Sequence, residues 1–263
     1  MKRSLSFIGL PLFLGLCAAF LRATELSYAF DPETGLYLSG LSATPALMIL
    51  SGVAFLLFSA LAFFTREEPL DAPTSPVLLP VGLVCTLILL ASAAFQIYFG
   101  ITQVFSMTNL IQALFSVYAA CAALVLCKKG FAPSNGGTYA VFAIAPAIWV
   151  SYTLILIYRD RVADPILLDY SYLLFAVVGA VLFLYALAGC IFGKKKLRLA
   201  VLSSSLTVFF SVCELLGHVI ALVLPSSVAV FDLSPIEALT LAFCLIFIPF
   251  AINELWKKKE IAE

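Results

Sequence analysis

The stretch LAVLSSSLTVFFSVCELLGHVIALVL, which runs from Leu199 to Leu224, decides the fold of this protein. It contains one acidic residue and one histidine, and it has no lysine or arginine. About 20 predominantly apolar residues are enough for an α-helix to cross the hydrocarbon core of a bilayer. We therefore predict that Leu199–Leu224 is a transmembrane helix.

The composition of the whole chain agrees with this prediction. Of its 263 residues, 63% are hydrophobic and 11% are charged, and the mean hydropathy is +1.11. A soluble domain of this length would need many more polar residues to cover its surface. The lipid bilayer is therefore the predicted environment. The formal net charge of +0, without a basic surface, gives no sign of a nucleic-acid partner.

Seven other stretches are also apolar and long enough to cross the membrane. The predicted spans are Leu5–Leu21, Pro45–Phe64, Pro76–Phe99, Asn109–Cys127, Tyr139–Tyr158, Tyr170–Phe192, Leu199–Leu224 and Pro235–Leu255. In lipid the backbone must satisfy its hydrogen bonds within each segment, and no stretch alternates as a barrel strand does. The sequence therefore predicts an all-α, polytopic transmembrane bundle of about eight spans.

The distribution of lysine and arginine predicts the orientation, because short cytoplasmic loops retain these residues. With the N-terminus inside, the cytoplasmic side holds Lys2, Arg3, Arg66, Lys128, Lys129, Lys194, Lys195, Lys196, Arg198, Lys257, Lys258 and Lys259. Only Arg22, Arg159 and Arg161 fall outside, where we also expect Glu25 in a solvated loop. An even number of spans then places both termini in the cytoplasm.

Similar segments recur along the chain at a separation of roughly 125 to 135 residues. The clearest pair is Ile111–Leu114 and Ile236–Leu239, which open the fourth and eighth predicted spans. We interpret the chain as two tandem four-helix halves, residues 1–130 and 131–263. Because each half has an even number of spans, the two would be parallel in the membrane.

The seventh predicted span carries a stripe of polar residues: Ser204, Thr207, Ser211, Glu214 and His218. Their spacing of three or four residues places them within an arc of about 80° on one helix face. Ionisable residues at membrane depth are costly, and by default they indicate a functional site. The alternative is that these groups only join helices through hydrogen bonds. Both interpretations remain open, with Glu214 and His218 as a ligand-binding or proton-handling pair in the first.

Several other polar residues have weaker functional claims. Gln96, Ser151 and Tyr152 lie within predicted spans, where a polar side chain more often contacts another helix than a ligand. Ser234 and Glu237 have the spacing of a capping box, in which each satisfies a free N–H group of the helix start. Asn109 and Gln112 repeat this spacing, so we interpret all four as structural caps.

The sequence predicts no metal site and no cofactor. His218 is the only histidine, which excludes a multi-histidine metal centre. None of the seven cysteines forms a C-x-x-C pair, and we interpret them as small apolar packing residues. Nucleophile elbows, phosphate-binding loops and dinucleotide fingerprints are also absent from the sequence, and this makes an enzyme less probable than a non-catalytic protein.

A segment from Arg159 to Tyr172, containing Asp164-Pro165-Ile166-Leu167-Leu168-Asp169, resembles one found in uncharacterised multi-pass membrane proteins of clostridial bacteria. The resemblance implies a bacterial cytoplasmic (inner) membrane. That family has no assigned activity, so the resemblance implies no catalytic or binding residue.

Three functional hypotheses follow. The leading one is a permease for a small solute or ion, with or without coupling to protons, and with its site between the two halves. The second is a non-catalytic membrane subunit or sensor whose polar stripe binds a partner helix. The third, which lacks an evident nucleophile, is an intramembrane enzyme acting on lipid with Glu214 or His218 as general base.

Overall fold

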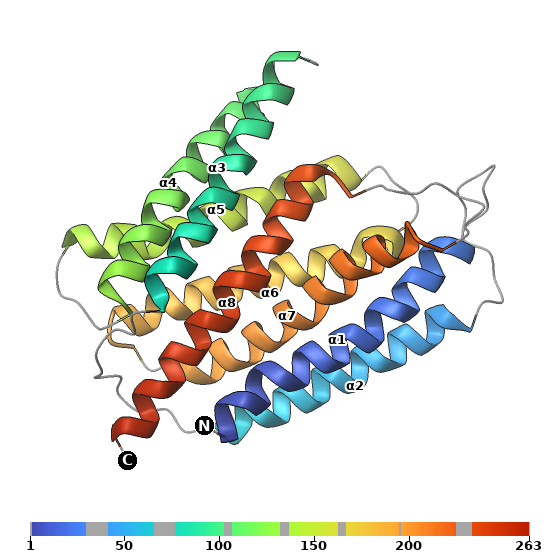
Figure 1. The fold of residues 1–263 in the computed structure, drawn as a ribbon, viewed down its shortest axis with the longest axis horizontal. Helices are drawn as coiled ribbons and strands as arrows, with labels where there is room; N and C mark the ends of the chain where they lie inside the picture. The colour runs from blue at the N-terminus through green and yellow to red at the C-terminus, as the bar shows by residue number, and fades with distance from the viewer. Residues whose placement is uncertain are drawn as a thin grey trace.

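The computed structural model describes residues 2–29, 42–65, 77–102, 107–131, 137–162, 167–194, 196–224 and 233–262. Within these residues the chain forms eight α-helices and no strands (Figure 1). They are α1 (Lys2–Tyr28), α2 (Ala43–Phe63), α3 (Leu78–Thr102), α4 (Met107–Lys129), α5 (Gly137–Arg161), α6 (Leu167–Ile191), α7 (Leu197–Ala221) and α8 (Pro235–Ala262). Each is long and apolar enough to cross a membrane. The predicted all-α polytopic bundle is confirmed.

Helix α7 is the central helix of the bundle. It packs against α1, α2, α6 and α8, and 72% of its span residues are buried, the largest share among the described helices. By contrast, only 22% of the residues in the α2 span are buried, because α2 packs on α1 and α7 and leaves its other face exposed. The residues of α7 are therefore the best placed in the chain to form an enclosed site.

Small residues allow α1 and α7 to lie unusually close together. Gly15, Ala19 and Ala23 recur every fourth residue along α1, a pattern that lets helix backbones approach in membranes. A Cβ atom added to Gly15 would lie 2.9 Å from Cβ of Val212 on α7. One added to Gly217 of α7 would lie 2.7 Å from Cγ of Arg22. This close contact places the C-terminal part of α1 beside the C-terminal part of α7.

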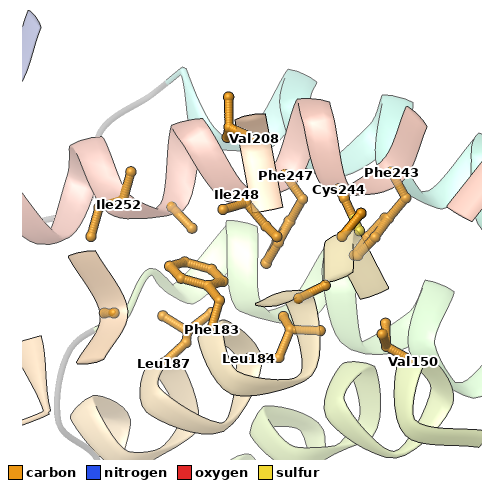
Figure 2. Packing of buried hydrophobic residues seen from close by; sticks show 14 of the residues in the cluster. Val150, Phe183, Leu184, Leu187, Val208, Phe243, Cys244, Phe247, Ile248 and Ile252 are labelled. Carbon is orange, nitrogen blue, oxygen red and sulfur yellow. The ribbon is translucent and has the colours of Figure 1, made fainter. Parts of the chain in front are cut away.

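A second, apolar contact region joins α5, α6 and α8. Figure 2 shows Phe183, Leu184 and Leu187 of α6 close to Phe247 and Ile248 of α8. At the α5 side, Trp149 meets Phe243 with ring centroids 5.2 Å apart in an edge-to-face arrangement. These contacts bury large apolar side chains without placing a charged group among them.

The helices of the two predicted halves interleave. Helices α1 and α2 pack on α7, α3 packs on α8, and α4 packs on α5. Figure 1 shows that the start of α1 and the end of α8, and with them both termini, lie at the same end of the bundle. The tandem repeat stays a prediction from sequence, and the halves 1–130 and 131–263 are not separate bundles.

Candidate functional site

All five residues of the polar stripe are enclosed within the bundle. Their exposed fractions are 2% for Ser204, 0% for Thr207, 0% for Ser211, 2% for Glu214 and 4% for His218. Because α7 is surrounded by four other helices, the stripe faces protein rather than lipid. The sequence analysis correctly placed the five residues on one helix, but it did not identify the helices that pack against that helix.

The hydroxyl groups of the stripe bond mostly to their own helix. Ser204 donates to the carbonyl of Val201 at 3.0 Å, and Thr207 donates to the carbonyl of Ser203 at 2.8 Å. Ser211 Oγ is different, since it is buried and has no hydrogen-bond partner among the residues that the structure describes. Of the three hydroxyls, Ser211 is therefore the one whose hydrogen-bonding capacity is left unused within the described part of the bundle.

Two residues that we expected in an outer loop, Arg22 and Glu25, lie instead inside the bundle. The predicted span ended at Leu21, but α1 continues to Tyr28, and both side chains are 0% exposed. The expectation was wrong because a hydropathy pattern ends a span at the first charge, whereas here the charges are paired inside the protein. Arg22 and Glu25 are the main site residues that the sequence analysis missed.

Arg22 holds two carboxylates at once. Its Nη1 donates to Glu25 Oε2 at 2.8 Å, one turn along the same helix. Its Nε and Nη2 donate to the two carboxylate oxygens of Glu214 on α7, at 3.1 and 3.3 Å. Such bidentate, charge-assisted pairs are the strongest hydrogen bonds between side chains. They join α1 to α7 at the position where Gly217 allows the two helices to approach.

His218 and Tyr172 complete this group. His218 Nδ1 lies 2.9 Å from the backbone carbonyl of Glu214, which can only accept, so Nδ1 carries the hydrogen. The same nitrogen is 3.7 Å from Glu214 Oε1. From α6, the ring of Tyr172 lies 5.1 Å from the guanidinium carbon of Arg22, a cation–π contact. We call Arg22, Glu25, Glu214, His218 and Tyr172 the Arg22 cluster.

Among the residues that the structure describes, the charges of the Arg22 cluster do not balance. One guanidinium faces two carboxylates, so with a neutral histidine the formal charge is −1. Glu25 Oε1 is buried and has no hydrogen-bond partner among the described residues. Arg22 and Glu214 lie six and seven residues from the ends of their helices, or about 10 Å at 1.5 Å per residue. The excess negative charge therefore lies at membrane depth, nearer to one surface than to the other.

The secondary candidates fall into two places, neither in contact with the Arg22 cluster. Gln96 joins α3 to α4, since its Nε2 donates to Ser92 at 3.0 Å and its Oε1 accepts from Ser116 at 3.2 Å. Ser151 and Tyr152 instead line a groove on the outer face of α5. Gln96 has the role of a contact between helices, while Ser151 and Tyr152 lie where a ligand could reach them.

The four residues interpreted as caps differ in their geometry. At the start of α8, Ser234 N donates to Glu237 Oε2 at 2.8 Å and Glu237 N donates to Ser234 Oγ at 3.2 Å, the reciprocal pattern of a capping box. Asn109 and Gln112, by contrast, lie within α4, which begins at Met107. Gln112 donates to Thr153 of α5 at 3.2 Å, so it joins two helices.

Metal-binding residue types do not gather in the described part of the chain. No group of three or more His, Cys, Asp or Glu side chains there could hold a metal ion. The seven cysteines are free thiols, and five of them are buried in the apolar core. The chemical groups of the Arg22 cluster are a guanidinium, two carboxylates, an imidazole and a phenol.

The comparisons with known proteins identify no relative for this architecture. No family model matches the sequence, and no curated protein and no solved structure matches it. The similarity to clostridial membrane proteins stays an expectation.

Proposed function

We propose that this protein is a proton-coupled permease for a small solute or ion, and that the Arg22 cluster is its proton-binding site. The observation that carries the proposal is the buried charge imbalance: one arginine and two carboxylates, each at most 2% exposed. Charged groups inside membrane helices are rare because they are costly, and in transport proteins they often form proton relays. We further propose a bacterial inner-membrane location with both termini in the cytoplasm.

Charge balance suggests that the Arg22 cluster binds one proton. A net charge of −1 in a low-dielectric interior is unfavourable, and one proton would reduce it to zero. The other titratable groups near the Arg22–Glu214 ion pair are Tyr172 on α6 and Cys213 on α7, and both are neutral when protonated. The described part of α2 has none, and at the start of α8 Glu237 pairs with Arg161 at 3.4 Å. The other ionisable groups of the cluster besides Arg22 are Glu25, Glu214 and His218.

The position of the ion pair suggests how proton binding could be coupled to transport. Helices α1 and α2 contact the rest of the bundle mainly through α7. The Arg22–Glu214 bridge crosses this contact, so a proton on Glu214 would weaken the bond between the α1–α2 pair and α7. A released guanidinium could then bind a carboxylate or phosphate of a solute. Proton binding would thus weaken the contact between the α1–α2 pair and α7, the same contact that has to open before a solute can reach Arg22.

The enclosed stripe weighs against the other two hypotheses. A partner helix would have to displace α1 or α6 before it could reach Ser211 and Glu214. A lipid substrate would meet the same barrier before it could reach Glu214 or His218 as general base. A permease, which by definition alternates between closed and open states, is compatible with a closed site.

Flux measurements in liposomes test the proposal. We would reconstitute the purified protein with a pH-sensitive dye inside and offer inorganic cations, carboxylates, phosphate, amino acids and sugars in turn. We expect proton movement with at least one class, and at least a tenfold slower rate for Glu214→Gln, which keeps the shape but cannot ionise. Glu237→Gln, which alters a carboxylate at a helix cap, is the matched control and should retain the rate.

Two results would overturn the proposal. One is the absence of proton movement with every class of solute in liposomes that contain correctly folded protein. The other is proton-coupled flux that is unchanged in Glu25→Gln, Glu214→Gln and His218→Gln alike.

A further inference from the structure

A groove on the outer face of the bundle runs along α5, between α4 and α6. Its volume is about 470 Å³, and its walls are mostly apolar. Its lining includes Ala147 and Ser151, two small residues one turn apart on α5, together with Phe115 of α4 and Leu182 of α6. It extends from Ala147 to Ile155, eight residues or about 12 Å at 1.5 Å per residue. The small side chains thus leave a narrow channel that faces the lipid.

One end of this groove carries a positive charge. Tyr185 of α6 lines the groove, and Lys196 Nζ lies 5.0 Å from the centre of its ring. The Lys196 side chain reaches Tyr185 by crossing Gly189, where an added Cβ would lie 3.0 Å from Lys196 Cγ. Gly189 therefore allows the lysine to lie flat along α6, with its apolar stem on the helix and its ammonium beside the Tyr185 ring, which lines the groove.

Further positive charge lies at the same membrane surface as Lys196. Lys194 and Arg198 flank Lys196 and are both exposed. Arg198 Nε donates to the carbonyl of Thr65 at 2.9 Å, which fixes it at this membrane surface. Tyr185 is six residues from the end of α6 at Ile191, about 9 Å below that surface. The groove thus starts just beneath a basic surface and runs towards the membrane centre.

We propose that this groove, lined by Phe115, Ala147, Ser151, Leu182 and Tyr185, binds an anionic phospholipid, with one acyl chain in the groove and the phosphate beside Lys196. A lipid of the adjacent leaflet has its phosphate at the membrane surface and its chain below it, which is the order of charge and apolar wall found here. Basic residues between helices near this surface are known to hold anionic headgroups. An apolar partner helix would fill the groove but would gain nothing from Lys196.

Native mass spectrometry of the detergent-purified protein tests this inference. The probes are phosphatidylglycerol and phosphatidylcholine with identical acyl chains, so that only the headgroup charge differs. We expect wild type to retain phosphatidylglycerol in preference. Ser151→Phe, which fills the groove, and Lys196→Ala, which removes the cation, should each weaken that binding about fivefold or more.

Matched controls separate the groove from general effects. Val53→Phe adds the same ring on the exposed face of α2, and Lys128→Ala removes a lysine at the exposed end of α4. Both should bind phosphatidylglycerol as wild type does. If Ser151→Phe fails to fold, as judged by circular dichroism and gel filtration, Ala147→Leu narrows the groove with a smaller side chain.

Three results would overturn the inference. The first is equal retention of the two lipids by wild type, which would exclude recognition of the phosphate charge. The second is undiminished phosphatidylglycerol binding in the groove-filling variants, which would place the lipid elsewhere. The third is a membrane protein that co-purifies with wild type and with Val53→Phe but not with Ser151→Phe, which would make the groove a protein interface.

Discussion

Replacing Arg22 by methionine should destabilise the protein strongly. The substitution keeps an unbranched side chain of similar length but removes the guanidinium that pairs with both Glu25 and Glu214. Two carboxylates would then remain inside the bundle, where Arg22 and Glu25 are 0% exposed and Glu214 is 2% exposed. Removing one member of a buried ion pair costs about 3–5 kcal/mol, because the remaining charge is uncompensated.

The expected loss can be measured as a melting temperature. For a chain of this size each kcal/mol corresponds to about 2–4 °C, so Arg22→Met should melt ~6–20 °C below wild type. Glu214→Met should cost less, since Arg22 keeps its bond to Glu25 at 2.8 Å. The double variant should lose less than the sum of the two single variants, because the two residues interact directly.

Arg159→Met is the control for this experiment. Arg159 also pairs with an acid, Asp160, at 2.7 Å, but its side chain is 49% exposed. Exposed pairs of this kind contribute about 0–1 kcal/mol. If Arg22→Met melted within experimental error of Arg159→Met, the buried cluster would not carry the energy that we assign to it, and the argument from charge imbalance would fail.

Three other predictions follow from packing, capping and topology. Gly217→Ala should cost about 1–3 kcal/mol in thermal unfolding, because the added Cβ would lie 2.7 Å from Cγ of Arg22. Gly52→Ala is the control and should be neutral or stabilising, because nothing lies within 4 Å of the added Cβ. Equal effects at both sites would contradict the close contact of α1 and α7. Ser234→Ala should lose about 1 kcal/mol, since it removes the acceptor for Glu237 N, and an unchanged melting temperature would argue against the cap. A membrane-impermeant maleimide added to intact cells should label Arg159→Cys but not Lys194→Cys, and the reverse pattern would invert the proposed orientation.

The number of spans was predictable from sequence because each helix carries its own signal. An apolar stretch of sufficient length identifies a span by itself, as Leu199–Leu224 does for α7. The capping box of Ser234 and Glu237 is also local, since the two residues are three positions apart. Such features depend only on neighbouring residues, and no knowledge of packing is needed to find them.

The composition of the Arg22 cluster was not predictable in the same way. Arg22 and Glu214 are 192 positions apart, and only the folded chain brings them together. Taken alone, Arg22 marks the end of an apolar run, so a hydropathy pattern places it in a loop. The recurrence of Gly15, Ala19 and Ala23 was an available signal, because it predicts close helix contact, but it does not say that the partner is α7.

The pairing of Arg22 within its own helix has a consequence for how the chain is made. At ~5–20 residues per second, ribosomes complete the 192 positions that separate Arg22 from Glu214 in roughly 10–40 seconds. During that interval the first helix must enter the membrane without its distant acid. The bond from Arg22 to Glu25, one turn away, supplies a carboxylate from the same segment. Glu25 would thus neutralise the charge of Arg22 while α1 enters the membrane, before Glu214 has been synthesised.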